Sequence, residues 1–163
     1  MRVVGAIIPL VGFVCLGAPA LAESLPDQGS AKLAAYEVCR PLALIDMGEV
    51  GSESSTECHG IVRNLESEKH PDNLAIHCLE TTSARPEAYK YSGTCEQIDS
   101  DGDKLFMTYE GSKTGQIKWI GGTGKYAGVT GSGDLGVVVA PGNTPTQFAY
   151  TLTYNVSWTR KAK

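Results

Sequence analysis

The sequence lacks the apolar spacing of an amphipathic helix and has few basic residues. Beyond residue 22, no segment of ten or more residues keeps a helical period, which argues against helical fold classes. Lysine and arginine number 14 against 18 acidic residues, and they gather only in a short tail at residues 160–163. An acidic chain without a basic patch is a poor nucleic-acid binder. We therefore expect no nucleic-acid partner.

Long hydrophobic runs are also missing, except for one near the start. Arg2 precedes the apolar stretch 3–17, and the small residues 20–22 precede Glu23. This order is typical of a secretory signal peptide cleaved after Ala22. The run is too short for a comfortable membrane span. We predict a signal peptide at 1–22, a flexible lead-in at 23–32 and one domain at 33–160, in a periplasmic or secreted protein without stable membrane insertion.

Four cysteines follow the predicted cleavage site: Cys39, Cys58, Cys78 and Cys95. An even number in an exported chain predicts two disulfides. The segments of Cys78 and Cys95 flank a turn at 84–87, which favours that pair and leaves Cys39 for Cys58. Cys58 opposite Cys78 remains an alternative, because their segments are also neighbours in the sequence.

Short strand-like segments separated by turn residues fill most of the chain. Candidates are 33–39, 43–47, 56–64, 74–80, 89–98, 104–111, 116–122, 133–140 and 148–158. In the last, apolar residues alternate with polar or small ones from Phe148 to Trp158, as in a half-buried strand. Because closure removes exposed sheet edges, we predict an all-β fold with a single antiparallel eight-stranded barrel.

The glycine-rich stretch 121–133 invites interpretation as a phosphate loop. Counting back from Gly124-Lys125 places Trp119 at the first glycine of that motif, and Tyr126 replaces its Ser or Thr. The dinucleotide fingerprint fails as well, because the spacing is one residue too long. We interpret the glycines as devices for tight bends in the backbone. They are Gly121, Gly122, Gly124, Gly128, Gly131 and Gly133.

Three stretches together resemble a known family. They are DSDGDKLFMTYEG, IKWIGGTGKYAGVTGSGDL and YTLTYNVSW, within residues 74–158. The chain is similar here to the allene oxide cyclase-like barrel superfamily, which includes the dirigent proteins. The resemblance implies a calycin-like barrel whose cavity receives an apolar small molecule. Some members cyclise or isomerise their ligand, but no catalytic residue carries over to this sequence, since fold does not fix function.

Two clusters suggest metal sites, and both have simpler explanations. Asp99, Asp101, Asp103 and Glu110 match an EF-hand loop in part, but Lys104 replaces its glycine, so a turn is favoured. Cys58-His59 and His77-Cys78 resemble a zinc set. However, neighbouring strand residues point to opposite faces, and the thiols are expected in disulfides. A register with His59 opposite His77 would leave a two-histidine surface site as an alternative to plain cross-strand packing of the two rings. We predict no metal and no cofactor.

The C-terminal strands contain the aromatic candidates for a cavity. They are Tyr109, Trp119, Tyr150, Tyr154 and Trp158. Glu110 is nearby in sequence but points away from Tyr109 in a strand. Our first hypothesis is a barrel that binds a small apolar or aromatic ligand. The second is a cofactor-free cyclase or isomerase, which needs an inward carboxylate or hydroxyl beside the aromatics. The third is a structural or partner-binding envelope protein with a filled core. Ligand identity and oligomeric state are not encoded in these patterns.

Overall fold

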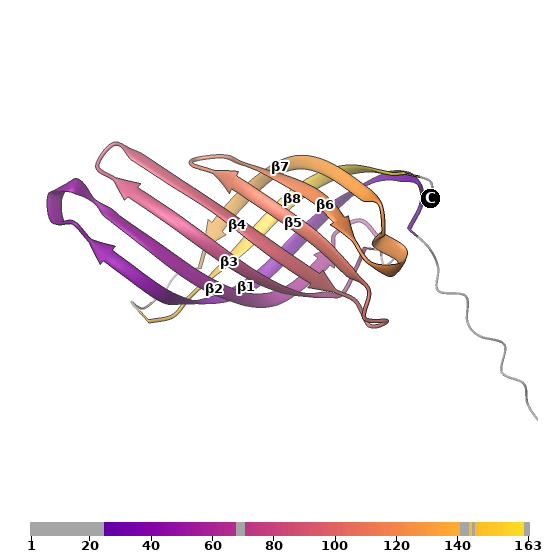
Figure 1. Cartoon of the computed structure of the whole chain (residues 1–163), viewed down its shortest axis with the longest axis horizontal. Coiled ribbons are helices and arrows are strands. Elements are labelled where there is room, and N and C mark those ends of the chain that lie inside the picture. Colours follow the sequence, from indigo (N-terminus) through magenta and orange to yellow (C-terminus); the bar gives the residue numbers. More distant parts are fainter. Residues whose placement is uncertain (1–24, 68–70, 141–143, 145, 162–163) are drawn as a thin grey trace, which may run out of the picture.

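The protein is an all-β closed barrel (Figure 1). The computed structural model describes residues 25–67, 71–140, 144 and 146–161. Each strand pairs antiparallel with the next, and β8 closes the barrel on β1, which confirms the predicted fold class. The strands are β1 (Gln28–Asp46), β2 (Ser52–Asn64), β3 (Leu74–Arg85), β4 (Ala88–Ile98), β5 (Lys104–Gly111), β6 (Gly115–Gly122), β7 (Val129–Val139) and β8 (Phe148–Arg160).

Helical structure is limited in the described residues to two short 3₁₀ turns, η1 (Gly48–Val50) and η2 (Gly124–Tyr126). No helix in this part of the chain has the length and apolar character needed to cross a membrane. The predicted signal peptide, 1–22, lies outside the described residues.

The first strand is longer than the sequence pattern indicated. The segments 33–39 and 43–47 are one strand with a register shift between Pro41 and Ala43. Proline cannot donate to the ladder and is tolerated at such a bulge. The strand also begins at Gln28, inside the segment 23–32 predicted to be flexible, because Gln28 pairs with Thr159 at the end of β8.

The four cysteines form a row across β1–β4 on the inside of the barrel. Cys39 pairs with Cys58, Cys58 with Cys78, and Cys78 with Cys95 in the strand register. The disulfides join Cys39 to Cys58 and Cys78 to Cys95, which is the favoured pairing. Two disulfides fit an oxidising environment.

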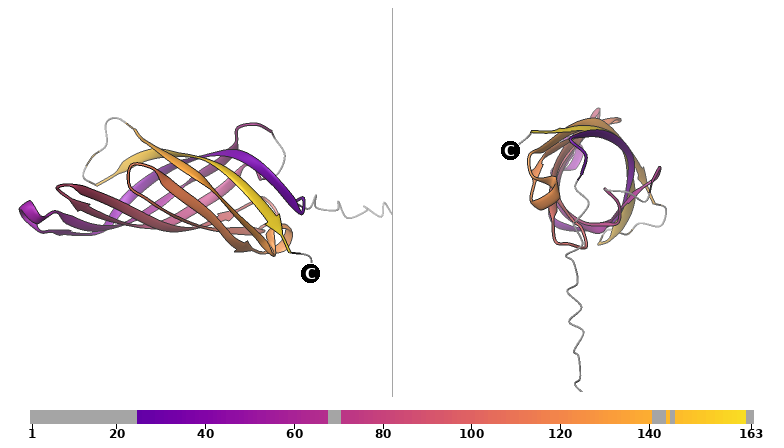
Figure 2. Two further views of the ribbon diagram at one scale, coloured as in Figure 1. Left: turned by 90° about the horizontal axis from the view of Figure 1, so that it is seen from above. Right: turned by 90° about the vertical axis from the view of Figure 1, so that its right-hand side faces the viewer.

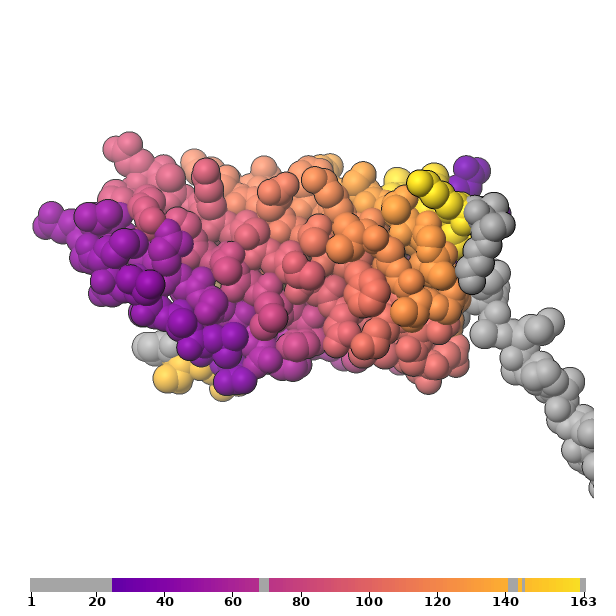
Figure 3. Space-filling view, viewed as in Figure 1, coloured from indigo at the N-terminus to yellow at the C-terminus, as the bar shows by residue number. Residues whose placement is uncertain are grey.

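The two ends of the barrel differ. At the end that contains the start of β1, buried aromatic side chains fill the interior: Trp119, Tyr126, Tyr154 and Trp158, with Leu25. The Trp119 and Trp158 rings lie 5.4 Å apart, and Trp158 Nε1 donates to the Pro26 carbonyl. The other end carries the β1–β2 hairpin, which projects beyond its neighbours (Figures 1 and 3). Figure 2 shows the ring of strands end-on.

The DSDGD turn between β4 and β5 packs against η2. Asp99 accepts hydrogen bonds from the amides of Asp101 (2.9 Å) and Asp103 (3.1 Å). Lys125 Nζ lies 3.0 Å from Asp99 Oδ2 and 2.5 Å from Asp101 Oδ2. The ammonium therefore lies beside two of the carboxylates that the calcium interpretation requires. Lys125 is held in this ion pair, with its side chain 3% exposed, so it does not present its charge to a phosphate.

Glycine is needed at position 124 for two reasons. Gly124 has φ +49°, and a side chain there would overlap the Asp103 carboxylate. The close approach lets Asp103 accept a hydrogen bond from the Lys125 amide (3.0 Å). This part of the glycine-rich stretch thus joins the turn at β4–β5 to the end of β6.

Candidate functional site

A cavity of about 510 Å³ lies inside the open end of the barrel. Its wall from β1, β7 and β8 is mainly apolar, with Pro41, Leu44, Val137, Val139, Phe148 and Leu152. Its wall from β2, β3 and β4 is mainly polar, with Ser54, Thr56, Glu80, Thr82, Tyr89 and Tyr91. Tyr150 joins the two walls, and Ser112 and Lys113 lie at the β5–β6 turn. A pocket of this size, with one apolar wall and one wall of hydroxyl and carboxyl groups, suits a small organic molecule that has both an apolar and a polar part.

Two glutamates and two tyrosines form a group at the inner part of this cavity, where two of them line it and two lie behind the wall. Tyr109 donates a hydrogen bond to Glu80 Oε2 (2.9 Å). Tyr150 Oη lies 3.5 Å from Glu37 Oε2 and 3.2 Å from Cys58 Sγ. Glu80 and Tyr150 line the cavity, whereas Glu37 lies behind Tyr150 and is 1% exposed. The arrangement places an acidic group and a phenol in reach of a bound molecule.

Burial shifts the pKa values of both glutamates upward. Desolvation and the negative charge of Glu80 raise the pKa of Glu37 to about 7, against the opposing effect of the Tyr150 hydrogen bond. Burial also raises the pKa of Glu80, although Tyr109 and Thr82 donate hydrogen bonds to it. A carboxyl group with a pKa near 7 exists in both protonation states at neutral pH. Glu37 can therefore take up or release a proton there.

The tyrosines remain neutral at this site. Burial, followed by the charges of Glu37 and Glu80, raises the pKa of Tyr150. Burial also raises the pKa of Tyr109. Each phenol is thus a hydrogen-bond donor or a proton relay, and neither is a phenolate. Glu37 Oε1 has no hydrogen-bond partner among the described residues.

The five predicted cavity residues all point inward, but they fall into two groups. Tyr150 lines the cavity, and Tyr109 contacts it through Glu80. Trp119, Tyr154 and Trp158 are buried in the filled end. These three side chains fill the barrel beyond the inner end of the cavity and do not line it.

Glu37 and Glu80 are not among the residues predicted for the cavity. Glu37 lies between Tyr36 and Val38, so simple alternation would bury those two and expose the glutamate. The structure has the opposite phase, with Tyr36 48% and Val38 49% exposed. The cysteines contained the missing signal, since Glu37 is two residues from Cys39 and Glu80 two residues from Cys78. Residues two apart on a strand share a face.

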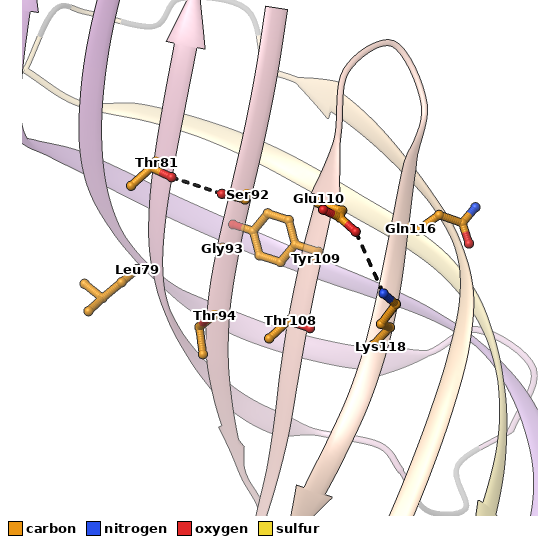
Figure 4. A pocket seen from close by; sticks show the side chains of 10 residues that line it. All are labelled: Leu79, Thr81, Ser92, Gly93, Thr94, Thr108, Tyr109, Glu110, Gln116 and Lys118. Atoms are coloured by element: carbon orange, nitrogen blue, oxygen red, sulfur yellow. Dashed lines mark hydrogen bonds and ion pairs between the residues drawn. The ribbon is translucent and has the colours of Figure 1, made fainter.

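A second hollow, of about 360 Å³, lies on the outer surface of β3–β6 (Figure 4). Hydroxyl and charged side chains border it, with a hydrogen bond between Thr81 and Ser92 (3.0 Å). Glu110 points outward, where its carboxylate lies 3.8 Å from Lys118 Nζ. The ring of Tyr109, on the inside of the sheet, packs over Gly93, and a side chain added at position 93 would overlap this ring. This hollow contains no buried acid or base, and we assign the site to the interior cavity.

No protein-family model and no curated protein sequence matches the chain. Among solved structures, it is similar to the pterocarpan synthase dirigent protein PsPTS1, with a TM-score of 0.53 and 12% identity over 85% of this chain and 100% of that one. For the pterocarpan synthase dirigent protein GePTS1, the TM-score is 0.50 with 11% identity over 86% of this chain and 91% of that one. At such identities the likeness establishes the fold alone. The chain thus has the barrel fold of the dirigent proteins, as the sequence resemblance predicted.

Proposed function

We propose that the barrel binds a small apolar or aromatic molecule in its open-end cavity. The observation that carries this proposal is the cavity of about 510 Å³ with an apolar wall facing a hydroxyl- and carboxyl-bearing wall. Burial of an apolar ring against β7 and β8 supplies affinity, and Glu80 or Tyr150 orients a polar group of the ligand. The dirigent fold supports the proposal, because two barrels of that fold are named pterocarpan synthases.

Filling the cavity is expected to abolish binding while the barrel remains folded. Val137 and Val138 are neighbours on β7, but only Val137 lines the cavity. We expect Val137→Trp to weaken binding of a neutral fluorescent naphthylamine dye by at least ~10-fold, because the indole occupies the ligand's volume. Val138→Trp adds the same side chain on the outer surface and is expected to leave binding unchanged. Fluorescence titration measures both.

The natural ligand can be sought by native mass spectrometry of the protein purified from its exported form. A retained molecule that is missing from Val137→Trp supports the proposal. Equal dye affinity for wild type, Val137→Trp and Val138→Trp would refute it, and would favour a structural protein with no ligand in this cavity.

A second candidate function is cofactor-free acid–base catalysis in the same cavity. The specific observation is the inward carboxylate beside a phenol, Glu80 with Tyr109, together with the raised pKa of Glu37 behind Tyr150. Glu80 would remove a proton from a carbon or hydroxyl of the ligand and return it at another position, so that no atom is lost. The barrel would restrict the ligand's conformation and exclude water. An isomerisation or cyclisation of this kind needs no redox partner.

Deuterium exchange separates a catalyst from a binder. The molecule recovered from the native protein is incubated in D₂O with wild type or with Glu80→Gln. A catalyst incorporates deuterium into a carbon-bound position, and Glu80→Gln loses this activity while it retains binding. Binding without any incorporation leaves the first proposal in place and rejects the second.

A further inference from the structure

The outer wall of the barrel carries a cluster that the cavity does not use. Cys58 and Cys78 point inward, so the next residues along each strand, His59 on β2 and His77 on β3, point outward. The strand register pairs His59 with His77, the arrangement that the sequence left as an alternative. Their rings stack with centroids 4.4 Å apart and an interplanar angle of 3°.

The carboxylate of Glu57 faces both imidazoles. Glu57 Oε1 lies 3.1 Å from His77 Nε2 and 3.7 Å from His59 Nε2. One ligand atom from each of the three residues lies within 4.8 Å of the others. Two imidazole nitrogens and one carboxylate oxygen therefore lie close together on the outer face of the sheet.

Neighbouring charges hold this cluster in place. Arg40 on β1 binds the other oxygen, Glu57 Oε2 (2.5 Å), which leaves Oε1 directed at the histidines. On the far side, Glu96 Oε1 lies 3.9 Å from His77 Nδ1, and Lys104 holds the same carboxylate (2.8 Å). A carboxylate that hydrogen-bonds the second ring nitrogen orients a metal-bound histidine, and Glu96 would have to approach His77 by less than ~1 Å to do so.

The alternative explanation is a plain ladder of alternating charges across β1–β5. Such a ladder accounts for Arg40, Glu57, His77, Glu96 and Lys104. It leaves out His59, whose ring stacks in parallel on that of His77 and whose Nε2 lies 3.7 Å from the same Glu57 oxygen. Two imidazoles with a shared carboxylate are the ligand set of divalent transition metals.

We propose that Glu57, His59 and His77 form a binding site for a divalent transition-metal ion such as Zn²⁺ or Cu²⁺ on the outer wall of the barrel. The three residues supply three ligands, and water completes the coordination. The site is separated from the cavity by the sheet itself, so it does not depend on the function proposed for the interior.

Isothermal titration of the full mature protein with Zn²⁺ and with Cu²⁺ tests the proposal. One equivalent of metal is expected to bind, and His59→Gln or His77→Gln is expected to lower the affinity by at least ~10-fold. His70→Gln, which changes the remaining histidine of the sequence, and Glu110→Gln, which removes an exposed carboxylate elsewhere on the wall, are matched controls with unchanged affinity. Nitrogen hyperfine splitting in the Cu²⁺ electron paramagnetic resonance spectrum should fall from two nitrogens to one in either histidine variant.

A second readout guards against misfolded variants. Zn²⁺ should raise the thermal unfolding midpoint of the wild type and not that of the His59→Gln/His77→Gln double variant, while both proteins have the same midpoint in the presence of a chelator. Equal metal affinity of wild type and double variant would overturn the proposal. Failure of the wild type to bind either metal with a defined stoichiometry would overturn it too.

Discussion

Replacing Lys125 with methionine is expected to destabilise the barrel by about 3–5 kcal/mol. The Lys125 and Asp99 side chains are only 3% and 2% exposed, and their charged atoms lie 3.0 Å apart. Methionine retains most of the packing volume but leaves the Asp99 carboxylate buried without its cation. Chemical unfolding with the disulfides intact measures the free energy of unfolding.

Two further variants isolate the ion pair from other effects. Lys118→Met removes a lysine whose side chain is 62% exposed, 3.8 Å from Glu110, and is expected to cost less than ~0.5 kcal/mol. Adding Asp99→Asn to Lys125→Met removes the unpaired charge and should recover part of the loss. Equal destabilisation by Lys118→Met and Lys125→Met would contradict the assignment of a buried ion pair.

Between acidic and neutral pH, the difference in unfolding free energy between wild type and Glu37→Gln is expected to change by about 3 kcal/mol. The pKa of Glu37 is raised from 4.5 to about 7 in the folded protein. The folded state therefore favours the protonated carboxyl, whose contribution is complete below pH 4.5 and is lost as the pH rises through about 7. Glutamine does not titrate, so the difference in unfolding free energy between wild type and variant should shift in favour of the variant across this window.

The measurement is a series of urea unfolding curves between pH 4 and 8 for both proteins. Glu110→Gln serves as the control, because its side chain is 71% exposed and outside the barrel. Since the charge of Glu80 is one cause of the raised pKa of Glu37, Glu80→Gln should move the upper limit of the window to lower pH. Parallel curves for wild type and Glu37→Gln would show that Glu37 keeps an ordinary pKa.

The sequence predicted the barrel because its signals were local. The alternation from Phe148 to Trp158 gives β8, and the turn chemistry of the DSDGD segment gives the β4–β5 connection. The course of β1 was harder to predict, because Pro41 interrupts the pattern and because the strand is completed by pairing with β8, more than a hundred residues away. Non-local pairing leaves no mark in a single segment.

The candidate site was predicted only in part. Aromatic residues at alternate positions suggested inward rings, but their distribution between a filled end and a cavity depends on depth along the barrel, which periodicity does not encode. Glu37 and Glu80 were hidden because acidic residues in strands usually face water. Only the phase set by the disulfide-bonded Cys39 and Cys78 assigns these glutamates to the interior.

The aromatic packing around Leu25 and Trp158 fills one end of the described part of the barrel, which leaves the cavity open at the other end. Under the proposed function, a ligand would enter and leave through the same opening, and a second ligand could bind only after the first had left. Ligands would not pass from one end of the barrel to the other. A ligand longer than the cavity would keep one end outside, beside the projecting β1–β2 hairpin. Its inner end would be the one that meets Glu80 and Tyr150, so under the proposed function the cavity would distinguish which end of a ligand enters first.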